Sequence, residues 1–191
     1  MASTGPSTER DSLTVSAGAD KPRQQRLWDE WWYDRFEIPN DLPPDVRRCA
    51  VEVQGSTWSL ALLDHIAPRT CQAFWELLPY EGQVIHCAWF GHAAFFLDRV
   101  ELPGMGYELE NRSAKLAPGD WVWDPYIKEI TFAYGRYAQV NFPTTIWLDG
   151  RPHPNQVCIF ARMVENLDSF AAMCKSLRFD GTKPMRVTRS S

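Results

Sequence analysis

The sequence lacks an excess of basic residues and any long apolar run. It carries 20 Lys and Arg against 24 Asp and Glu, a formal net charge of -4, and the basic residues are scattered. Nucleic-acid-binding proteins usually concentrate basic charge, so we expect no nucleic-acid partner. No segment approaches the ~20 apolar residues of a membrane helix. The first residues lack a charged start followed by an apolar run and a cleavage site, so we expect a cytoplasmic protein with no membrane contact.

Cysteine and histidine are too few and too widely spaced to indicate disulfides or a metal site. The five cysteines are odd in number, set among apolar neighbours and without a CxxC pair. This distribution is typical of reduced thiols in a core. Among the four histidines, His86, His92 and His153 offer no close ligand pair and no carboxylate-rich spacing. The sequence therefore predicts no bound metal.

Tryptophan, by contrast, is abundant, with nine among 191 residues. Large aromatic rings that carry a polar N–H or O–H group are frequent at interfaces and in aromatic ligand sites.

The N-terminal part of the chain differs in composition from the rest. Residues 1–24 contain few apolar side chains that could be buried, which predicts a disordered tail. Residues 25–46 form a Trp-rich N-terminal arm whose rings recur at helical spacing until prolines end the pattern. This arm either packs on the domain or a second subunit, or is a lid that supplies rings to a ligand. Its apolar surface favours a homo-oligomer.

Residues 47–188 carry the pattern of one β-rich domain. One helix is expected from Ala67 to just before Gly82, and another near 166–178. Alternating or continuous apolar runs predict strands at 48–54, 58–63, 83–89, 93–97, 120–124, 127–134, 157–164 and 185–189. Eight strands fit a closed antiparallel barrel plugged by helices, because closure leaves no sheet edge exposed. The sequence therefore predicts a mainly β fold, a closed eight-stranded barrel with two capping helices.

Several segments resemble known families. APRTCQAFWELLP resembles the first helix of the cyclophilins, and the order of elements resembles their fold. The catalytic arginine and the Phe-Met-Gln segment of prolyl isomerases have no counterpart in VIHCAWFGHAAFFLD, so isomerase activity is not expected. IHCAWFGHAAF, ENRSAKLAPGDWVW, EITFAYG and FARMVENLDSF resemble a bacterial family of small cyclophilin-like proteins that includes cucumopine synthase and related Pictet-Spengler enzymes. This resemblance covers residues 47–188 and implies a cyclophilin-like barrel.

The same resemblance implies a condensation chemistry. Cucumopine synthase joins the amine of histidine to the ketone of 2-oxoglutarate, after which the aromatic ring attacks the iminium and loses a proton. Such a reaction needs a general acid, a base and clamps for carboxylates, but no metal or organic cofactor. Because this chain is rich in rings, we expect tryptophan rather than histidine as the amine, with a 2-oxo acid such as 2-oxoglutarate. The product would be a carboxylated tetrahydro-β-carboline.

Two functions of other classes stay open at this point. One is a non-catalytic protein that binds small aromatic or carboxylate metabolites, which needs the same rings and cations but no proton-transfer group. The other is a cyclophilin-like module that binds peptides. A fold alone does not decide among these functions.

Four residues are candidates for the proton-transfer steps. Glu110 lies near aromatic strands, where burial can raise a carboxyl pKa, or it is a solvated loop charge. Asp124 follows two tryptophans at a strand end, or it initiates the turn before the next proline. His86 lies in a family-like segment, although a buried histidine bonded to backbone fits equally well. His92 occupies a position where the family more often carries a carboxylate, and a histidine there can titrate near neutral pH. Glu129, by contrast, is expected to be a charge on the barrel surface.

Two arginines and two tyrosines are candidates for binding the substrate. Arg136 and Arg162 suit the clamping of carboxylates, because the arginine fork binds a carboxylate at two points. Either arginine can instead be an ordinary ion-pair partner. Tyr134 and Tyr126 offer hydroxyls and ring faces near the same turn, although tyrosines at strand ends are common without a function.

Three tryptophans are candidates for the walls of a pocket. Trp89, Trp121 and Trp123 have the flat rings that an indole or imidazole substrate needs, although core or interface packing explains each one singly. On an extended strand, Trp89 and His86 lie on opposite faces, so these two need not act together.

Overall fold

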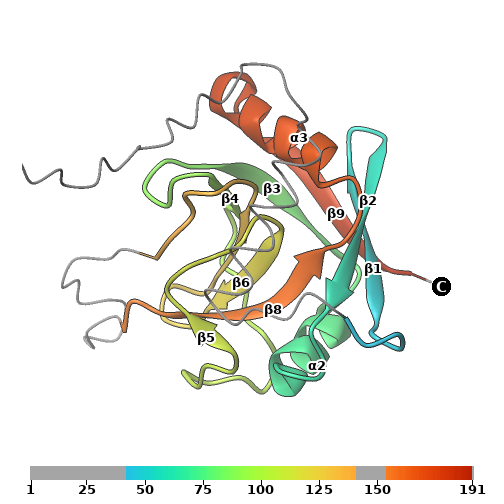
Figure 1. Cartoon of the computed structure of the whole chain (residues 1–191), viewed down its shortest axis with the longest axis vertical. Coiled ribbons are helices and arrows are strands. Elements are labelled where there is room, and N and C mark those ends of the chain that lie inside the picture. Colours follow the sequence, from blue (N-terminus) through green and yellow to red (C-terminus); the bar gives the residue numbers. More distant parts are fainter. Residues whose placement is uncertain (1–41, 141–153, 191) are drawn as a thin grey trace, which may run out of the picture. The chain divides into compact units, whose positions relative to one another are not determined.

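The strands of this chain close into a barrel (Figure 1). The computed structural model describes residues 42–140 and 154–190. The strands are β1 (Arg48–Val53), β2 (Ser56–Leu62), β3 (Tyr80–Cys87), β4 (Ala93–Phe96), β5 (Arg112–Ser113), β6 (Asp120–Asp124), β7 (Glu129–Ala133), β8 (Val157–Met163) and β9 (Lys183–Arg189). Antiparallel ladders join them in the order β2-β1-β9-β3-β4-β7-β6-β8, and β2 pairs with β8 to close the circle. The short β5 is an extra strand paired with β8. The predicted eight-stranded closed barrel is therefore confirmed.

The burial of each strand follows its sequence pattern. In β1 the buried residues alternate, at Cys49, Val51 and Val53, as in a strand with one covered face. In β6 and β8 every residue is buried, so both faces of these strands are covered. The continuous apolar runs of the sequence thus mark the part of the barrel whose outside is also shielded from water.

The first helix is shorter than the sequence predicts. Helix α2 (Pro68–Leu77) begins at a proline, which suits a first turn because its missing N–H would have no partner there. It ends before Leu78, whose backbone is extended (φ -73°, ψ 140°), because a residue that precedes a proline avoids the helical region. Strand β3 then begins at Tyr80, so Gly82 lies inside a strand instead of just past a helix end.

Both helices insert aromatic rings into the barrel. Helix α3 (Leu167–Asp180) extends the helix predicted near 166–178 by two residues at its end. Phe74 of α2 lies 5.0 Å from Phe160, and Phe170 of α3 lies 5.6 Å from Phe132, between ring centroids. Burying such a ring stabilises the fold by about 1.5–3 kcal/mol. The helices lie on opposite sides of the barrel in Figure 1, as predicted for helices that plug it.

The barrel interior is filled with large rings. Trp121 stacks on Phe132 with centroids 4.8 Å apart, and Phe96 meets both rings edge-on at 6.1 Å. An eight-stranded barrel is just wide enough for its own side chains to fill. The filled interior leaves the outside of the barrel and its ends as the places where a ligand can bind.

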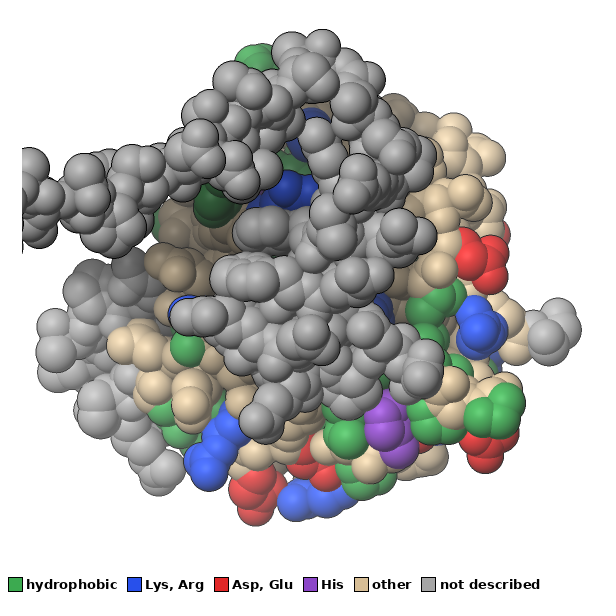
Figure 2. Space-filling model, viewed as in Figure 1, with side chains coloured by type: hydrophobic (Ala, Val, Ile, Leu, Met, Phe, Trp, Pro, Cys, Tyr) green, Lys and Arg blue, Asp and Glu red, His purple; other side chains and the backbone are tan. Residues whose placement is uncertain are grey.

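Charges of both signs are mixed on the surface. Arg69 pairs with Glu108 at 3.0 Å, and Arg47 pairs with Asp64. Figure 2 shows Lys and Arg side chains beside Asp and Glu along the lower edge of the described surface, with neither sign gathered into one patch there. Within the part of the chain that the structure describes, no helix has the length and apolar character needed to cross a bilayer.

Some sequence predictions fall outside the described residues. These are the tail at 1–24, most of the Trp-rich arm at 25–46, and His153. They stay predictions.

Candidate acid-base site on the outer barrel face

One outer face of the barrel is apolar and covered. Because Trp121 and Phe132 point into the interior, their neighbours Val122 and Thr131 point outward. Yet these two side chains are only 1% and 2% exposed. Val122 belongs to a second apolar cluster, here called the outer-face cluster. Its members are Leu63, Cys87, Phe90, Ala93, Phe95, Leu116, Val122, Ala133, Ala138, Val140, Val157 and Ile159. A polar group within such a desolvated face changes its chemistry.

Two carboxylates meet on this face. The β6–β7 hairpin pairs Asp124 directly with Glu129, and Thr131 follows on the same side of β7. Asp124 is 1% exposed, and its Oδ1 accepts a hydrogen bond from the backbone N–H of Tyr126 at 2.9 Å. Glu129 is partly buried, and its Oε1 accepts a hydrogen bond from the Thr131 hydroxyl at 2.6 Å. Directly opposed side chains of one ladder lie ~5 Å apart at Cβ, so the two carboxylates feel each other's charge.

This placement changes the acidity of Glu129. The pKa of the Glu129 carboxyl is raised to about 7, chiefly by burial; the Thr131 hydrogen bond lowers it, and the neighbouring Asp124 charge adds a smaller upward contribution. A carboxyl with this pKa is present in both protonation states at neutral pH and can donate or accept a proton. Burial also raises the pKa of the nearby Cys87 thiol to about 12, which leaves it unsuited to act as a nucleophile.

His86 and His92 come together on one tyrosine at the barrel end. The Tyr134 hydroxyl and His86 Nδ1 are 3.0 Å apart and share a hydrogen bond. His92 stacks on the Tyr134 ring with centroids 5.7 Å apart. Burial, followed by the charge of Arg178, lowers the pKa of His86. Burial raises the pKa of Tyr134, so this group is neutral at physiological pH. His86 and His92 thus both contact Tyr134, which could not be inferred from their positions in the sequence.

The two arginines have different surroundings. Arg162 is buried, and its Nε and a terminal nitrogen both lie 2.8 Å from Asp120 Oδ1, while Asp120 Oδ2 accepts the backbone N–H of Ala117 at 2.8 Å. This arrangement is the ion-pair alternative that the sequence left open. Arg136 is exposed beyond the end of β7. Binding of a substrate carboxylate by either arginine stays a prediction.

The aromatic candidates lie in three separate places. Trp121 and Trp123 are buried in the interior, and the Trp123 indole N–H donates to the Val100 carbonyl at 3.2 Å. Trp89 is 60% exposed and lies 5.5 Å from Phe95, a member of the outer-face cluster. Tyr126 packs against another tyrosine, Tyr107, at 5.1 Å. Of the three tryptophans, Trp89 is therefore the one available to an external ligand.

Glu110 lies at the start of α2. Its Oε1 accepts the backbone N–H of Arg69 at 3.2 Å, and its Oε2 accepts the backbone N–H and the hydroxyl of Thr70 at 2.8 and 2.9 Å. A carboxylate in this position satisfies otherwise unpaired helix N–H groups and interacts favourably with the helix dipole. The structure thus gives Glu110 a capping role, and a catalytic role for it stays a prediction.

The sequence pattern alone did not identify Glu129 as a candidate acid-base residue. Glu129 lies on the outer face of the barrel, as expected of a barrel surface charge, but it is partly buried there beside a second carboxylate, which raises its pKa. The signal was present in WVWDPYIKEITF, where a four-residue turn sets Asp124 opposite Glu129. What the pattern did not reveal is that the outer face of this hairpin is covered. Among the described residues, no group of three or more His, Cys, Asp or Glu is placed to hold a metal ion.

The fold and the site together define a small closed β-barrel whose covered outer face holds a carboxylate pair suited to proton transfer. The chain belongs to DUF3830, a family described as being of unknown function, and the family model matches residues 49–189. This match spans the barrel from its first strand to its last. No curated protein matches at a significant level.

The solved structures that are similar to this chain in fold include those of two proteins. One is a structure of McbB in complex with tryptophan, with a TM-score of 0.58 at 16% identity, over 75% of this chain and 45% of that one. The other is the solution structure of the hypothetical protein AF2241 from Archaeoglobus fulgidus, with a TM-score of 0.48 at 17% identity, over 76% and 95% of the two chains. This chain thus spans less than half of the McbB chain. At such identity the likeness to McbB concerns the fold alone.

Proposed function

We propose that this protein catalyses a Pictet-Spengler condensation of an aromatic amino acid, tryptophan in preference to histidine, with a 2-oxo acid such as 2-oxoglutarate. The product is a carboxylated tetrahydro-β-carboline. The observation that carries this proposal is the cross-strand pair of Asp124 and Glu129, with a Glu129 pKa of about 7 on an apolar face. The resemblance of four sequence segments to the family of cucumopine synthase supports it, as does the shared fold of a protein solved with tryptophan.

The reaction needs one group that both gives and takes a proton. The amine adds to the ketone to form a carbinolamine, which loses water to give an iminium. Protonated Glu129 supplies the proton with which the hydroxyl leaves as water. The aromatic carbon then attacks the iminium carbon and forms the new C–C bond. The resulting Glu129 carboxylate takes the ring proton, which restores aromaticity and the starting state of the enzyme. One water is released overall.

The neighbours of Glu129 fit these steps. The buried Asp124 carboxylate adds negative charge next to Glu129, which favours a cationic iminium. The Thr131 hydroxyl holds the Glu129 carboxyl in one orientation through its 2.6 Å hydrogen bond. The rings of Phe95 and exposed Trp89 supply an apolar wall for an indole. In this proposal Arg136, the exposed candidate, is the first to test as a clamp for the substrate carboxylates.

The test is mass spectrometry of the purified protein with 2-oxoglutarate and each aromatic amino acid in turn. A control without protein is required because this condensation proceeds slowly unaided. We expect one stereoisomer at the summed mass minus one water, formed faster than in the control. Glu129→Gln should lower the enzymatic rate by ~10²-fold or more, because it removes the acid-base group. Glu81→Gln, an exposed carboxylate on β3, is the matched control for loss of one charge.

The opposite outcome is equally clear. Product formed at the control rate for every pair of reactants would contradict the proposal. If tryptophan nevertheless binds without turnover, the non-catalytic metabolite-binding function takes its place. Proline-peptide binding without either result would favour the cyclophilin-like peptide module.

A further inference from the structure

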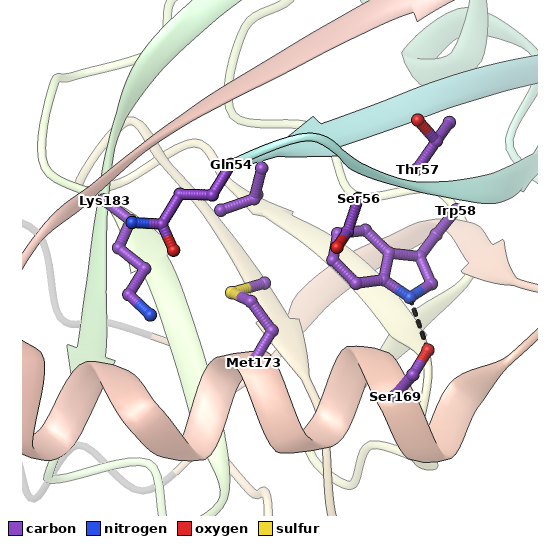
Figure 3. A pocket seen from close by; sticks show the side chains of 8 residues that line it. Gln54, Ser56, Thr57, Trp58, Ser169, Met173 and Lys183 are labelled. Carbon is purple, nitrogen blue, oxygen red and sulfur yellow. Dashed lines mark hydrogen bonds between the residues drawn. The ribbon is translucent and has the colours of Figure 1, made fainter.

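A separate pocket lies between the β1–β2 turn, helix α3 and strand β9 (Figure 3). Its volume is about 550 Å³, within the range of pockets that hold small molecules. Lining side chains from four elements meet here, and none of them belongs to the β6–β7 hairpin that carries Glu129. The pocket therefore has its own chemistry.

One wall of the pocket is held rigidly. The Trp58 indole N–H donates to the Ser169 hydroxyl at 2.8 Å, and that hydroxyl donates to the Asn166 carbonyl at 2.8 Å. The Trp58 ring also meets Phe170 edge-on, with centroids 5.5 Å apart. Trp58 is 6% exposed, so it presents a fixed ring edge and not a mobile face. Figure 3 shows Met173 beside it, and a flexible thioether adapts to the shape of an apolar guest.

Opposite this wall stands a cation that is held in place. Lys183 is 8% exposed, and its Nζ lies 2.5 Å from the Ser176 hydroxyl and 2.9 Å from Asp180 Oδ2. An ammonium group has three N–H donors. Two have these partners among the described residues, which leaves one for a group inside the pocket that Lys183 lines. The paired Asp180 is 53% exposed, so its carboxylate faces water on the side away from the core.

The rim of the pocket is polar. Gln54 in the β1–β2 turn is exposed, as are Ser56 and Thr57 at the start of β2. Gln54 (φ 49°) and Gly55 (φ 82°) both adopt the left-handed conformation, which makes a tight two-residue turn. Gln54 and Lys183 both line the pocket, and Figure 3 draws them on the side away from Trp58. An amide N–H and a held ammonium together form a site that suits a carboxylate.

We infer that this pocket binds a small monocarboxylate with an apolar or aromatic body. The carboxylate is bound by Lys183 and Gln54, and the body lies against Met173 and the edge of Trp58. Lys183 is a single cation, and two of its three N–H donors are already bonded. It therefore favours a monocarboxylate over a phosphate or a dicarboxylate. This site is independent of the proposed catalytic chemistry.

The test uses phenylacetate as the probe and phenylacetamide as its uncharged match. The full chain is labelled with ¹³C at methionine methyl groups, and the Met173 signal is assigned with Met173→Leu. Phenylacetate is titrated to about 10 mM, enough to detect millimolar affinity. We expect a saturable shift of the Met173 signal with phenylacetate and a much smaller one with phenylacetamide.

Two substitutions with opposite expected effects sharpen this test. Lys183→Met removes the cation and should weaken phenylacetate binding by ~10-fold or more. Asp180→Asn removes the carboxylate that shares the Lys183 charge, so binding should tighten by ~2- to 5-fold. Asp180 is largely exposed, so Asp180→Asn should fold normally. It therefore still tests the inference if Lys183→Met fails to fold. Glu129→Gln should leave phenylacetate affinity unchanged, which separates this site from the proposed catalytic one.

The inference is overturned by any of three results. They are the absence of a Met173 shift, an equal response to acid and amide, or a phenylacetate affinity that weakens in Asp180→Asn. Failure of the condensation assay alone leaves this site standing, because binding at Met173 is measured without turnover.

Discussion

Among single residues, Glu110 and Glu129 differ in their surroundings, and this difference decides which of them is suited to acid-base chemistry. Glu110 has both oxygens bonded to N–H and O–H donors at the start of a helix. Glu129 has one hydroxyl donor among the described residues and a second carboxylate across the ladder. Burial and the neighbouring carboxylate disfavour the charged form of Glu129. Glu129 is therefore the carboxyl with the properties of an acid-base group.

The buried ion pair of Arg162 and Asp120 gives a first prediction. Arg162→Leu leaves the Asp120 charge buried without its cation, so the free energy of unfolding should fall by ~3–5 kcal/mol. Arg48→Leu is the matched control, because Arg48 forms an exposed pair with Glu165 at 3.8 Å and should cost ~0.5 kcal/mol or less. Urea unfolding measures both values. Equal, small losses would mean that Arg162 does not hold the Asp120 charge.

At the scale of elements, the strands were predictable and their coverage was not. All eight barrel strands appear near their predicted positions, because each has a clear apolar pattern. The first helix was predicted too long, because LLPYEG was interpreted as a helix end when Leu78 before Pro79 already stops the helix. The two-residue β5 has no pattern of its own. Which outer faces are buried depends on contacts between distant segments, so the environment of Glu129 was not readable from its strand.

The capping of α2 by Glu110 gives a second prediction. Glu110→Ala removes the acceptor of two backbone N–H groups, so it should lower the free energy of unfolding by ~1 kcal/mol. Hydrogen exchange at Arg69 and Thr70 should become faster. Glu108→Ala is the control, because Glu108 pairs with the exposed side chain of Arg69. Indistinguishable exchange in the two variants would refute the capping role.

The β3–β4 connection gives a third prediction. Gly91 has φ +79°, and an added Cβ would lie 2.2 Å from the Tyr137 carbonyl oxygen. Gly91→Ala should therefore destabilise the fold by ~3 kcal/mol or more, since backbone strain and a backbone clash add. Gly104, with φ +71° and open space around it, is the control that isolates the strain, at ~1 kcal/mol. Thermal unfolding compares the two variants, and similar losses would show that the clash is relieved by a small shift.

At the scale of the whole molecule, the ionisation of Glu129 ties function to stability. A proton on Glu129 is held more tightly in the folded chain, with a pKa of about 7, than in the unfolded chain, near 4.5. Between these pH values the folded state binds more protons, so the free energy of unfolding falls as pH rises. A site that keeps such a carboxyl gives up stability near neutral pH in exchange for a group that transfers protons.

This linkage gives a fourth prediction. Glu129→Gln should be more stable than the original protein by ~1–3 kcal/mol at about pH 8, and equally stable at about pH 4. Glu81→Gln removes the same charge from an exposed site, so its stability relative to the original protein should not change in this way between about pH 4 and about pH 8. Denaturant unfolding at several pH values measures the difference. A Glu129→Gln variant that is less stable at about pH 8 would mean that the ionised carboxylate is well solvated or paired.

The proposed function depends on Glu129 exchanging its proton near neutral pH within the folded barrel. The most direct measurement is a pH titration of the ¹³C-labelled glutamate side-chain carboxyl signals by NMR, with the Glu129 signal assigned by its loss in Glu129→Gln. We expect an inflection for the Glu129 signal near pH 7. An inflection at the ordinary glutamate value near 4.5 would show that the barrel does not perturb Glu129 and would remove it as the acid-base group.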